Sequence, residues 1–216
     1  MPEKSELRII AGSLKGRKLT CFVHEGMRPT PQMVREALFS ILGNAIPGRI
    51  FYDIFAGTGV VGVEAVSRGA SRAALIEKDP KQVGDIHKHL DRFGIAAKTQ
   101  VLRADCYRWA ERWVPPPGGP VNLFLSPPFP DLQPGKLPAF LAMVEHLLAK
   151  APDDSVIVIQ AEDGFIYDDL PGGPDAWDIR KYGRNLLLFR VKGDSLPAES
   201  APHEQESDIE EPEHTD

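Results

Sequence analysis

Short apolar runs alternate with helix-forming segments from residue 50 to residue 162, and this alternation restricts the possible folds more than any other feature. Five runs predict strands: 50–55, 72–79, 98–105, 121–125 and 154–162. Four segments predict helices: 60–68, 80–93, 107–113 and 136–150. Strands joined through helices by short loops lie parallel, so the pattern predicts an α/β fold with a mostly parallel sheet covered on both faces. Residues 176–191 predict two further strands that turn at Gly183 and end the sheet antiparallel.

An additional module precedes the alternating region. Residues 7–22 predict two short strands with turns at Gly12–Ser13 and Lys15–Gly16, which together form a small hairpin. A helix is predicted next, with Thr30 as its cap and Pro31 at its first position. Its apolar stripe consists of Val34, Leu38, Ile41 and Leu42.

Charge is distributed unevenly along the chain. The net charge is -6, but residues 194–216 contain nine acidic residues and no Lys or Arg. The chain therefore divides into an N-terminal hairpin and helix extension (1–48), a main domain (49–193) and an acidic tail (194–216) that we expect to be disordered. Residues 1–50 carry eight basic and four acidic residues, which suits an anionic partner.

No apolar run approaches the roughly 20 residues needed to cross a bilayer. The two cysteines, Cys21 and Cys106, have neither redox nor zinc spacing, and the histidines are scattered. We therefore expect a cytoplasmic protein without a metal site. We also expect a monomer.

A glycine-rich loop lies between the strand at 50–55 and the helix at 60–68. The sequence GTGVVG at 57–62 matches the Gly-x-Gly-x-x-Gly pattern, in which Gly57 and Gly59 let the backbone approach a nucleotide. Glu77, 20 residues after Gly57, is placed to accept hydrogen bonds from ribose hydroxyls. The loop alone fits a nicotinamide dinucleotide or S-adenosylmethionine, because both present a ribose.

Carboxylates around this loop favour S-adenosylmethionine. Asp53 lies four residues before Gly57, where it would attract an ammonium group and repel a pyrophosphate. Phe55 lies between them and is expected to contact the cofactor. Asp105 ends the third strand, where it can accept a hydrogen bond from an adenine amine or cap the following helix.

The fourth strand, 121–125, ends in Ser126, Pro127, Pro128 and Phe129. Prolines cannot donate to a sheet, so the strand must stop here, and the backbone after it has few conformations. The segment is either a simple strand-terminating turn or a rigid part of a binding site.

The order FAGTG (55–59), IEKD (76–79), Asp105 and SPPF (126–129) resembles that of amino-group methyltransferases acting on nucleic-acid bases. The segments RIIAGSLKGRKL, RPTPQMVREALFSIL and YDIFAGTGVVGVEAVSRGA are similar to the bacterial small-subunit (16S) ribosomal RNA (guanine-N2) methyltransferase family. The similarity covers residues 7–192. It implies a Rossmann-like class I S-adenosylmethionine-dependent methyltransferase fold with a seven-stranded sheet and an N-terminal extension.

The resemblance also implies roles for individual residues. Ser126 and the carbonyl of Pro127 would accept hydrogen bonds from the guanine amine, and Phe129 would stack on the base. Thr30 would lie over the cofactor. The family has Asp where this chain has Ser126, and a neutral acceptor forms a hydrogen bond roughly half as strong as a carboxylate's. Serine here resembles the cytosine-N4 branch of the DNA methyltransferases.

Basic side chains in the N-terminal part would bind small-subunit ribosomal RNA, either naked or partly assembled. These are Lys15, Arg17, Lys18, Arg28 and Arg35. Two alternatives stay open. One is a non-catalytic RNA-binding or assembly factor that has lost turnover through Ser126, and the other is a nicotinamide-dependent oxidoreductase.

Overall fold

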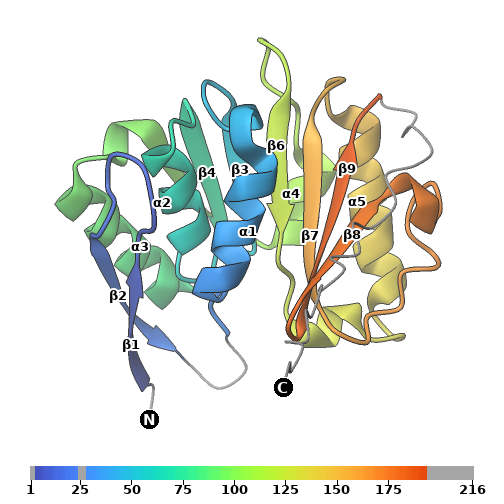
Figure 1. Cartoon of the computed structure of the whole chain (residues 1–216), viewed down its shortest axis with the longest axis horizontal. Helices are drawn as coiled ribbons and strands as arrows, with labels where there is room; N and C mark the ends of the chain where they lie inside the picture. The colour runs from blue at the N-terminus through green and yellow to red at the C-terminus, as the bar shows by residue number, and fades with distance from the viewer. Residues whose placement is uncertain (1–2, 24–27, 194–216) are drawn as a thin grey trace, which may run out of the picture.

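The computed structural model describes residues 3–23 and 28–193, so the predicted acidic tail lies outside the described residues. A seven-stranded sheet forms the centre of the molecule, with the order β5-β4-β3-β6-β7-β9-β8 (Figure 1). Its strands are β3 (Ile50–Ile54), β4 (Arg72–Glu77), β5 (Thr99–Arg103), β6 (Val121–Leu125), β7 (Val156–Glu162), β8 (Asp178–Tyr182) and β9 (Asn185–Val191). Strands β3 to β7 are mutually parallel, and β9 is antiparallel to both of its neighbours. The predicted sheet is confirmed.

Helices cover the two faces of the sheet. They are α1 (Gln32–Leu42), α2 (Val60–Ser67), α3 (Pro80–Phe93), α4 (Cys106–Arg112) and α5 (Leu137–Lys150). Alternate strand residues supply two cores: Phe51 packs with the side chains of α1 to α3, and Tyr52 packs with those of α4 and α5. Short 3-10 turns complete the structure: η1 (Gly43–Ala45), η2 (Ala96–Lys98), η3 (Phe129–Leu132) and η4 (Pro174–Ala176). No helix in the described ranges is long and apolar enough to cross a membrane.

A hairpin is present, formed by β1 (Glu3–Arg8) and β2 (Lys18–Val23), which pair antiparallel. Its first strand begins at Glu3, before the predicted range of 7–22, because the polar residues at 3–6 pair with β2. The hairpin packs on α2 through the segment between its strands. Glu64 of α2 is fully buried, and its carboxylate accepts hydrogen bonds from the backbone amides of Ile10, at 2.8 Å, and Ala11, at 3.0 Å. Ile9 lies in the same core as α2, so the extension shares the hydrophobic core of the main domain.

The start of α1 differs from the prediction. Pro31 is the N-cap residue, and no side chain caps the helix. The Thr30 hydroxyl instead donates to Gln160 Oε1 of β7 at 2.8 Å, and Thr30 is 6% exposed. The predicted capping role of Thr30 is therefore wrong, because a buried acceptor on the sheet binds its hydroxyl.

Strand order determines where a ligand can bind. Strand β3 lies between β4 and β6. From β3 the chain adds β4 and β5 on one side and then crosses over to add β6 and β7 on the other, so the order of the parallel strands reverses between β3 and β6. In doubly wound sheets, ligands bind at the carboxyl ends of the strands next to such a reversal. Ile54 and Leu125 are in register at the ends of β3 and β6, which places the glycine loop beside the SPPF segment.

Candidate active site

Three residues of the loop after β3 have left-handed backbone conformations. Phe55, Gly57 and Gly59 have φ values of 69°, 52° and 73°. Only glycine adopts this region readily, so Gly57 and Gly59 fit their positions, whereas Phe55 is held there by its surroundings. A Cβ atom on Gly59 would lie 2.9 Å from Leu75 Cδ2, so the loop also packs closely on β4.

Glu77, at the end of β4, holds the glycine loop in place. Its Oε2 accepts a hydrogen bond from the amide of Gly57 at 2.7 Å, and its Oε1 accepts one from the amide of Asp79 at 2.8 Å. The structure thus brings together the predicted loop and the predicted ribose-binding acid. A role toward ribose stays a prediction, and the remaining lone pairs of the carboxylate can serve it.

Asp53 lies beneath the loop. It is 1% exposed, and its Oδ2 accepts a hydrogen bond from the amide of Gly62 in α2 at 2.8 Å. Burial raises the pKa of Asp53 to about 7; the Gly62 hydrogen bond lowers it, and the charge of Glu77 adds to the increase. The carboxyl group therefore supports α2, and its contact with an ammonium group stays a prediction.

Asp105 is exposed and caps α4, because its Oδ1 accepts a hydrogen bond from the amide of Arg108 at 3.1 Å. The capping role that the sequence allowed is confirmed, and an adenine contact stays a prediction. Tyr107, two residues on, packs edge-to-face against Phe55 with ring centroids 5.8 Å apart.

The SPPF segment leaves β6 at the edge of the same site. The amide of Ser126 donates to the carbonyl of Ile54 at 3.3 Å, so the segment continues the pairing with β3. Pro127 is buried, while Phe129 begins η3 and is 52% exposed. An exposed aromatic ring directly after a rigid turn can receive a planar ligand.

Gln160 of β7 is a site residue that the sequence prediction missed. Its Oε1 accepts hydrogen bonds from the hydroxyls of Thr30, at 2.8 Å, and Ser126, at 3.3 Å. Its Nε2 donates to Asn185 Oδ1 of β9 at 3.1 Å. An amide oxygen only accepts, so the Ser126 proton points toward Gln160 and the Ser126 lone pairs are left for another donor. The available signal was a polar residue inside the apolar run VIVIQA (156–161).

Asp131, also not predicted, anchors η3 to the neighbouring helices. The Tyr107 hydroxyl donates to its Oδ2 at 2.8 Å, and the Lys136 ammonium donates to its Oδ1 at 3.1 Å. Burial, reinforced by the bond to Asp131, raises the pKa of Tyr107 well above its usual range, so its phenol remains a donor. The turn that presents Phe129 is therefore held from one side by α4.

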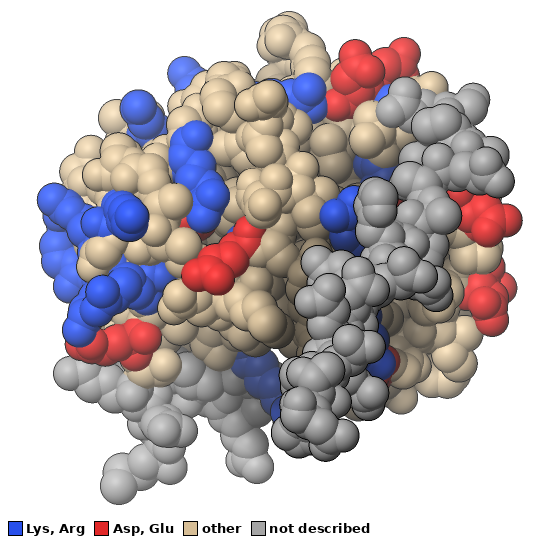
Figure 2. Space-filling view, viewed as in Figure 1, with Lys and Arg blue, Asp and Glu red and all other residues tan. Residues whose placement is uncertain are grey.

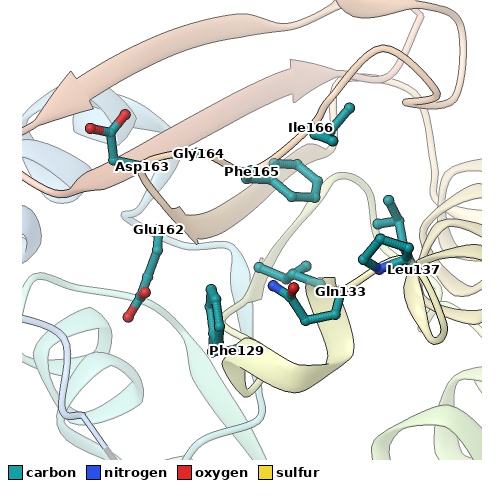
Figure 3. A pocket seen from close by; sticks show the side chains of 10 residues that line it. Phe129, Gln133, Leu137, Glu162, Asp163, Gly164, Phe165 and Ile166 are labelled. Atoms are coloured by element: carbon teal, nitrogen blue, oxygen red, sulfur yellow. The ribbon is translucent and has the colours of Figure 1, made fainter.

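A pocket of about 240 Å³ lies next to Phe129 (Figure 3). Its lining is mainly apolar, with polar groups at its edge: Phe129, Leu132, Gln133, Pro134, Leu137, Glu162, Asp163, Gly164, Phe165 and Ile166. Glu162 Oε1 also pairs with Arg28 Nη1 at 2.9 Å. Arg28, predicted to bind phosphate, is thus exposed beside the candidate site.

The remaining predicted RNA-binding residues divide into two groups. Lys15, Arg17 and Lys18 are exposed on the hairpin, where Figure 2 shows Lys and Arg gathered at the left of the view. Arg35 is different: it is 1% exposed and donates to the carbonyls of Thr30, at 2.7 Å, and Arg8, at 2.9 Å. The structure therefore does not present Arg35 to RNA, and its guanidinium joins the hairpin to α1.

Arg92 of α3 extends the exposed basic group. Both Arg17 and Arg92 lie over the ring of Phe93, at 5.4 and 4.9 Å from its centroid. We call the set Lys15, Arg17, Lys18 and Arg92 the basic face. Sequence reasoning missed Arg92 because only the fold brings α3 to the hairpin.

A doubly wound sheet with a glycine loop after β3, an acid at the end of β4 and SPPF at the end of β6 defines a class I methyltransferase. Residues 7–191 match the family described as Conserved hypothetical protein 95, and the chain belongs to this family, which contains the ribosomal RNA small subunit methyltransferase D and YlbH proteins.

Relatives agree with this assignment. The ribosomal RNA small subunit methyltransferase D of Escherichia coli strain K12 is 33% identical over 177 residues, covering 82% of this chain and 83% of that protein. YlbH of Bacillus subtilis is 31% identical over 151 residues, covering 70% of this chain and 80% of that protein. The solved structure of yhhF from Escherichia coli superposes with a TM-score of 0.67 at 30% identity, covering 87% of this chain and 99% of that one. The resemblance inferred from the sequence is confirmed.

The residues around the glycine loop fit S-adenosylmethionine. Glu77 and Asp105 supply carboxylate oxygens, which match the hydroxyls of a ribose and the amine of an adenine. A cationic sulfonium cofactor also suits an acidic site better than a pyrophosphate does. Together with the family, this supports S-adenosylmethionine as the cofactor and leaves the nicotinamide alternative without support.

Proposed function

We propose that the protein methylates the exocyclic N2 amine of a guanine in small-subunit ribosomal RNA, with S-adenosylmethionine as the methyl donor. The observation that carries this proposal is the position of Ser126, Pro127 and Phe129 beside the glycine loop, fixed by the Ile54–Leu125 register. The name of the Escherichia coli relative, a small subunit methyltransferase, supports ribosomal RNA as the substrate.

The chemistry of a guanine amine explains what the residues must do. Its lone pair is delocalised into the ring, so the amine is a weak nucleophile, and the protein contributes mainly orientation and exclusion of water. Ser126 Oγ, whose proton is directed to Gln160, and the Pro127 carbonyl accept hydrogen bonds from the amine. Phe129 stacks on the base, an interaction worth about 1–3 kcal/mol. The cofactor, when bound, supplies an electrophilic methyl group on its sulfonium.

The exposed basic residues give the RNA a second point of attachment. The basic face lies on the hairpin and α3, and Arg28 lies beside the pocket. Lys and Arg side chains bind phosphates without reading the sequence, and so they would orient the RNA while the pocket selects the base.

The test is transfer of labelled methyl from S-adenosylmethionine to small-subunit RNA, both naked and partly assembled, followed by nucleoside analysis. We expect labelled N2-methylguanosine. A different methylated nucleoside would refute the assigned base. RNA binding without any transfer, in both forms of the substrate, would instead establish the non-catalytic alternative.

A further inference from the structure

We propose that Glu162 reads the N1–H group of the target guanine and thereby selects guanine over adenine and cytosine. This inference rests on the proposed function, since it assigns the recognition of the base whose amine is methylated. It follows from the position of one carboxylate at the edge of the pocket beside Phe129.

Glu162 is the last residue of β7, two residues after Gln160. Residues two apart in a strand face the same side, about 7 Å apart along the strand. Gln160 contacts Ser126, and β7 pairs with β6, so Glu162 lies beyond the Ser126 acceptor on the side where Phe129 lies. Glu162 and Phe129 both line the pocket, and in Figure 3 the Glu162 side chain extends on the left of Phe129, on the side away from Gln133, Leu137, Phe165 and Ile166.

The chemistry of a carboxylate matches one base. An ionised Glu only accepts hydrogen bonds. In guanine the N1–H donor is attached to the carbon that bears the 2-amine, so a guanine with its amine at Ser126 has a donor immediately alongside. Adenine N1 and cytosine N3 are acceptors. If either faced the Glu162 carboxylate, the ring nitrogen and the carboxylate would both lack a hydrogen-bond donor, which is strongly unfavourable in a desolvated site.

The present partner of Glu162 does not block this role. Its ion pair with Arg28 joins side chains that are 40% and 74% exposed. Exposed pairs of this kind contribute little to stability, so a base can replace or share the contact. Arg28 then remains beside the base, near the phosphates of the bound strand.

Other polar groups of the pocket are less suited to this task. Asp163 points away from Phe129 in Figure 3 and pairs with Lys181 at 2.8 Å. Gln133 has an amide, which can donate as well as accept, and so it does not distinguish N1–H from a ring acceptor. Glu162 is therefore the residue whose substitution should change base preference.

The experiment compares guanine with 2-aminopurine at the methylated position, introduced by ligation of synthetic RNA. 2-Aminopurine keeps the 2-amine but has an acceptor at N1. We expect the wild-type protein to prefer guanine, and Glu162→Gln to shift the guanine to 2-aminopurine rate ratio toward 2-aminopurine by about tenfold or more, because its amide can donate to N1. Glu162→Asp, which keeps the carboxylate, should retain the wild-type ratio at a lower rate.

Asp163→Asn is the matched control, since it neutralises the adjacent acid of the same pocket and should leave the ratio unchanged. Comparing this rate ratio between variants cancels any general loss of activity in a variant. It also cancels the effect of the O6 that 2-aminopurine lacks, because every variant is assayed with the same two substrates. An unchanged ratio in Glu162→Gln, with guanine still methylated by the wild-type protein, overturns this inference alone. A wild-type protein that transfers no methyl to guanine overturns the proposed function first.

Discussion

At the scale of single residues, Gln160 accounts for how a serine could act as the amine acceptor that we propose at position 126, where the family resemblance implies an aspartate. The amide oxygen of Gln160 accepts hydrogen bonds from the hydroxyls of Thr30 and Ser126, and its amide nitrogen donates one to Asn185 Oδ1. The Ser126 oxygen is thus oriented as an acceptor before any base arrives. Preorganisation of this kind partly offsets the weaker hydrogen bond of a neutral oxygen.

Replacing Gln160 should test this orientation. Gln160→Leu removes the acceptor and should lower the methyl-transfer rate about tenfold or more at saturating RNA, with little change in cofactor affinity, because Ser126 can then point its proton toward the amine. Gln160→Glu keeps an acceptor and should retain more activity. Single-turnover rates and cofactor titration measure the two effects. Equal activities of both variants would contradict the orientation argument.

Asp53 makes the stability of the protein depend on pH in an unusual direction. Its pKa is raised to about 7 in the folded state, so between about pH 4 and pH 7 the folded protein binds the proton more strongly than the unfolded chain does. The contribution of Asp53 to the free energy of unfolding is therefore present at low pH and is lost as pH rises toward 7.

Asp53→Asn should remove this dependence, because the amide is neutral and its oxygen can still accept from Gly62. We expect the variant to be more stable than the wild type at pH 8 and to have a flatter stability profile between pH 5 and pH 7. Urea unfolding at several pH values measures both. The exposed Asp105→Asn variant is the control, and a wild-type-like slope in Asp53→Asn would refute the argument.

At the scale of elements, the attachment of the N-terminal hairpin to α2 depends on a very close backbone contact. The amide of Ser13 donates to the Ser67 carbonyl at 2.8 Å, and the amide of Leu14 donates to Ser67 Oγ at 2.9 Å. Gly12 crosses the end of α2 so closely that a Cβ atom would lie 1.8 Å from Ser67 O. Only glycine fits there.

Gly12→Ala should therefore destabilise the protein far more than Gly16→Ala. Both glycines have positive φ, 82° and 84°, but a Cβ atom on Gly16 would meet no other atom within 4 Å. We expect about 1 kcal/mol for Gly16→Ala from the backbone alone. For Gly12→Ala we expect at least about 3 kcal/mol, because the clash forces the hairpin away from α2. Denaturant midpoints of the two variants check this, and equal losses would contradict it.

Local signals account for the elements that the sequence predicted well. Pro80 and Gly94 bracket α3, whose observed bounds, Pro80–Phe93, equal the predicted ones, and the prolines after Leu125 end β6 where expected. Long-range partners account for what was missed. The fold alone joins Glu64 to the hairpin and Gln160 to Ser126, and it buries Arg35, whose charge suggested a surface role.

At the scale of the whole molecule, the basic face and the pocket lie on different elements. The basic face lies on the hairpin and α3, beside the β5 and β4 side of the sheet, whereas Phe129 follows β6 and Glu162 is the last residue of β7. The hairpin contacts the C-terminal ends of α2 and α3, at Ser67 and Arg92, which precede the first residues of β4 and β5. RNA that contacts both the basic face and the pocket must therefore run from the amino ends of β4 and β5 to the carboxyl ends of β6 and β7. Binding should therefore have a strong electrostatic component.

The salt dependence of RNA affinity should report this contact. Arg92→Gln should weaken RNA binding and reduce the slope of log affinity against log salt by about one, the change expected when one phosphate contact is lost. Arg180→Gln is the matched control, because Arg180 pairs with Asp178 on β8 at the far end of the sheet. Filter binding over a salt series measures both, and identical slopes would remove Arg92 from the RNA contact.

The place of β9 in the sheet has a consequence for folding during synthesis on the ribosome. Strand β9 follows β8 in the chain but lies between β7 and β8, and its first residue, Asn185, accepts the hydrogen bond that holds Gln160. Domains begin to fold while synthesis continues from the N-terminus. A nascent chain can therefore form the glycine loop early, but it completes the support of Ser126 only after residue 185 has left the ribosome. A translation product interrupted before that residue would carry every predicted cofactor-binding residue and an unfinished site for the base.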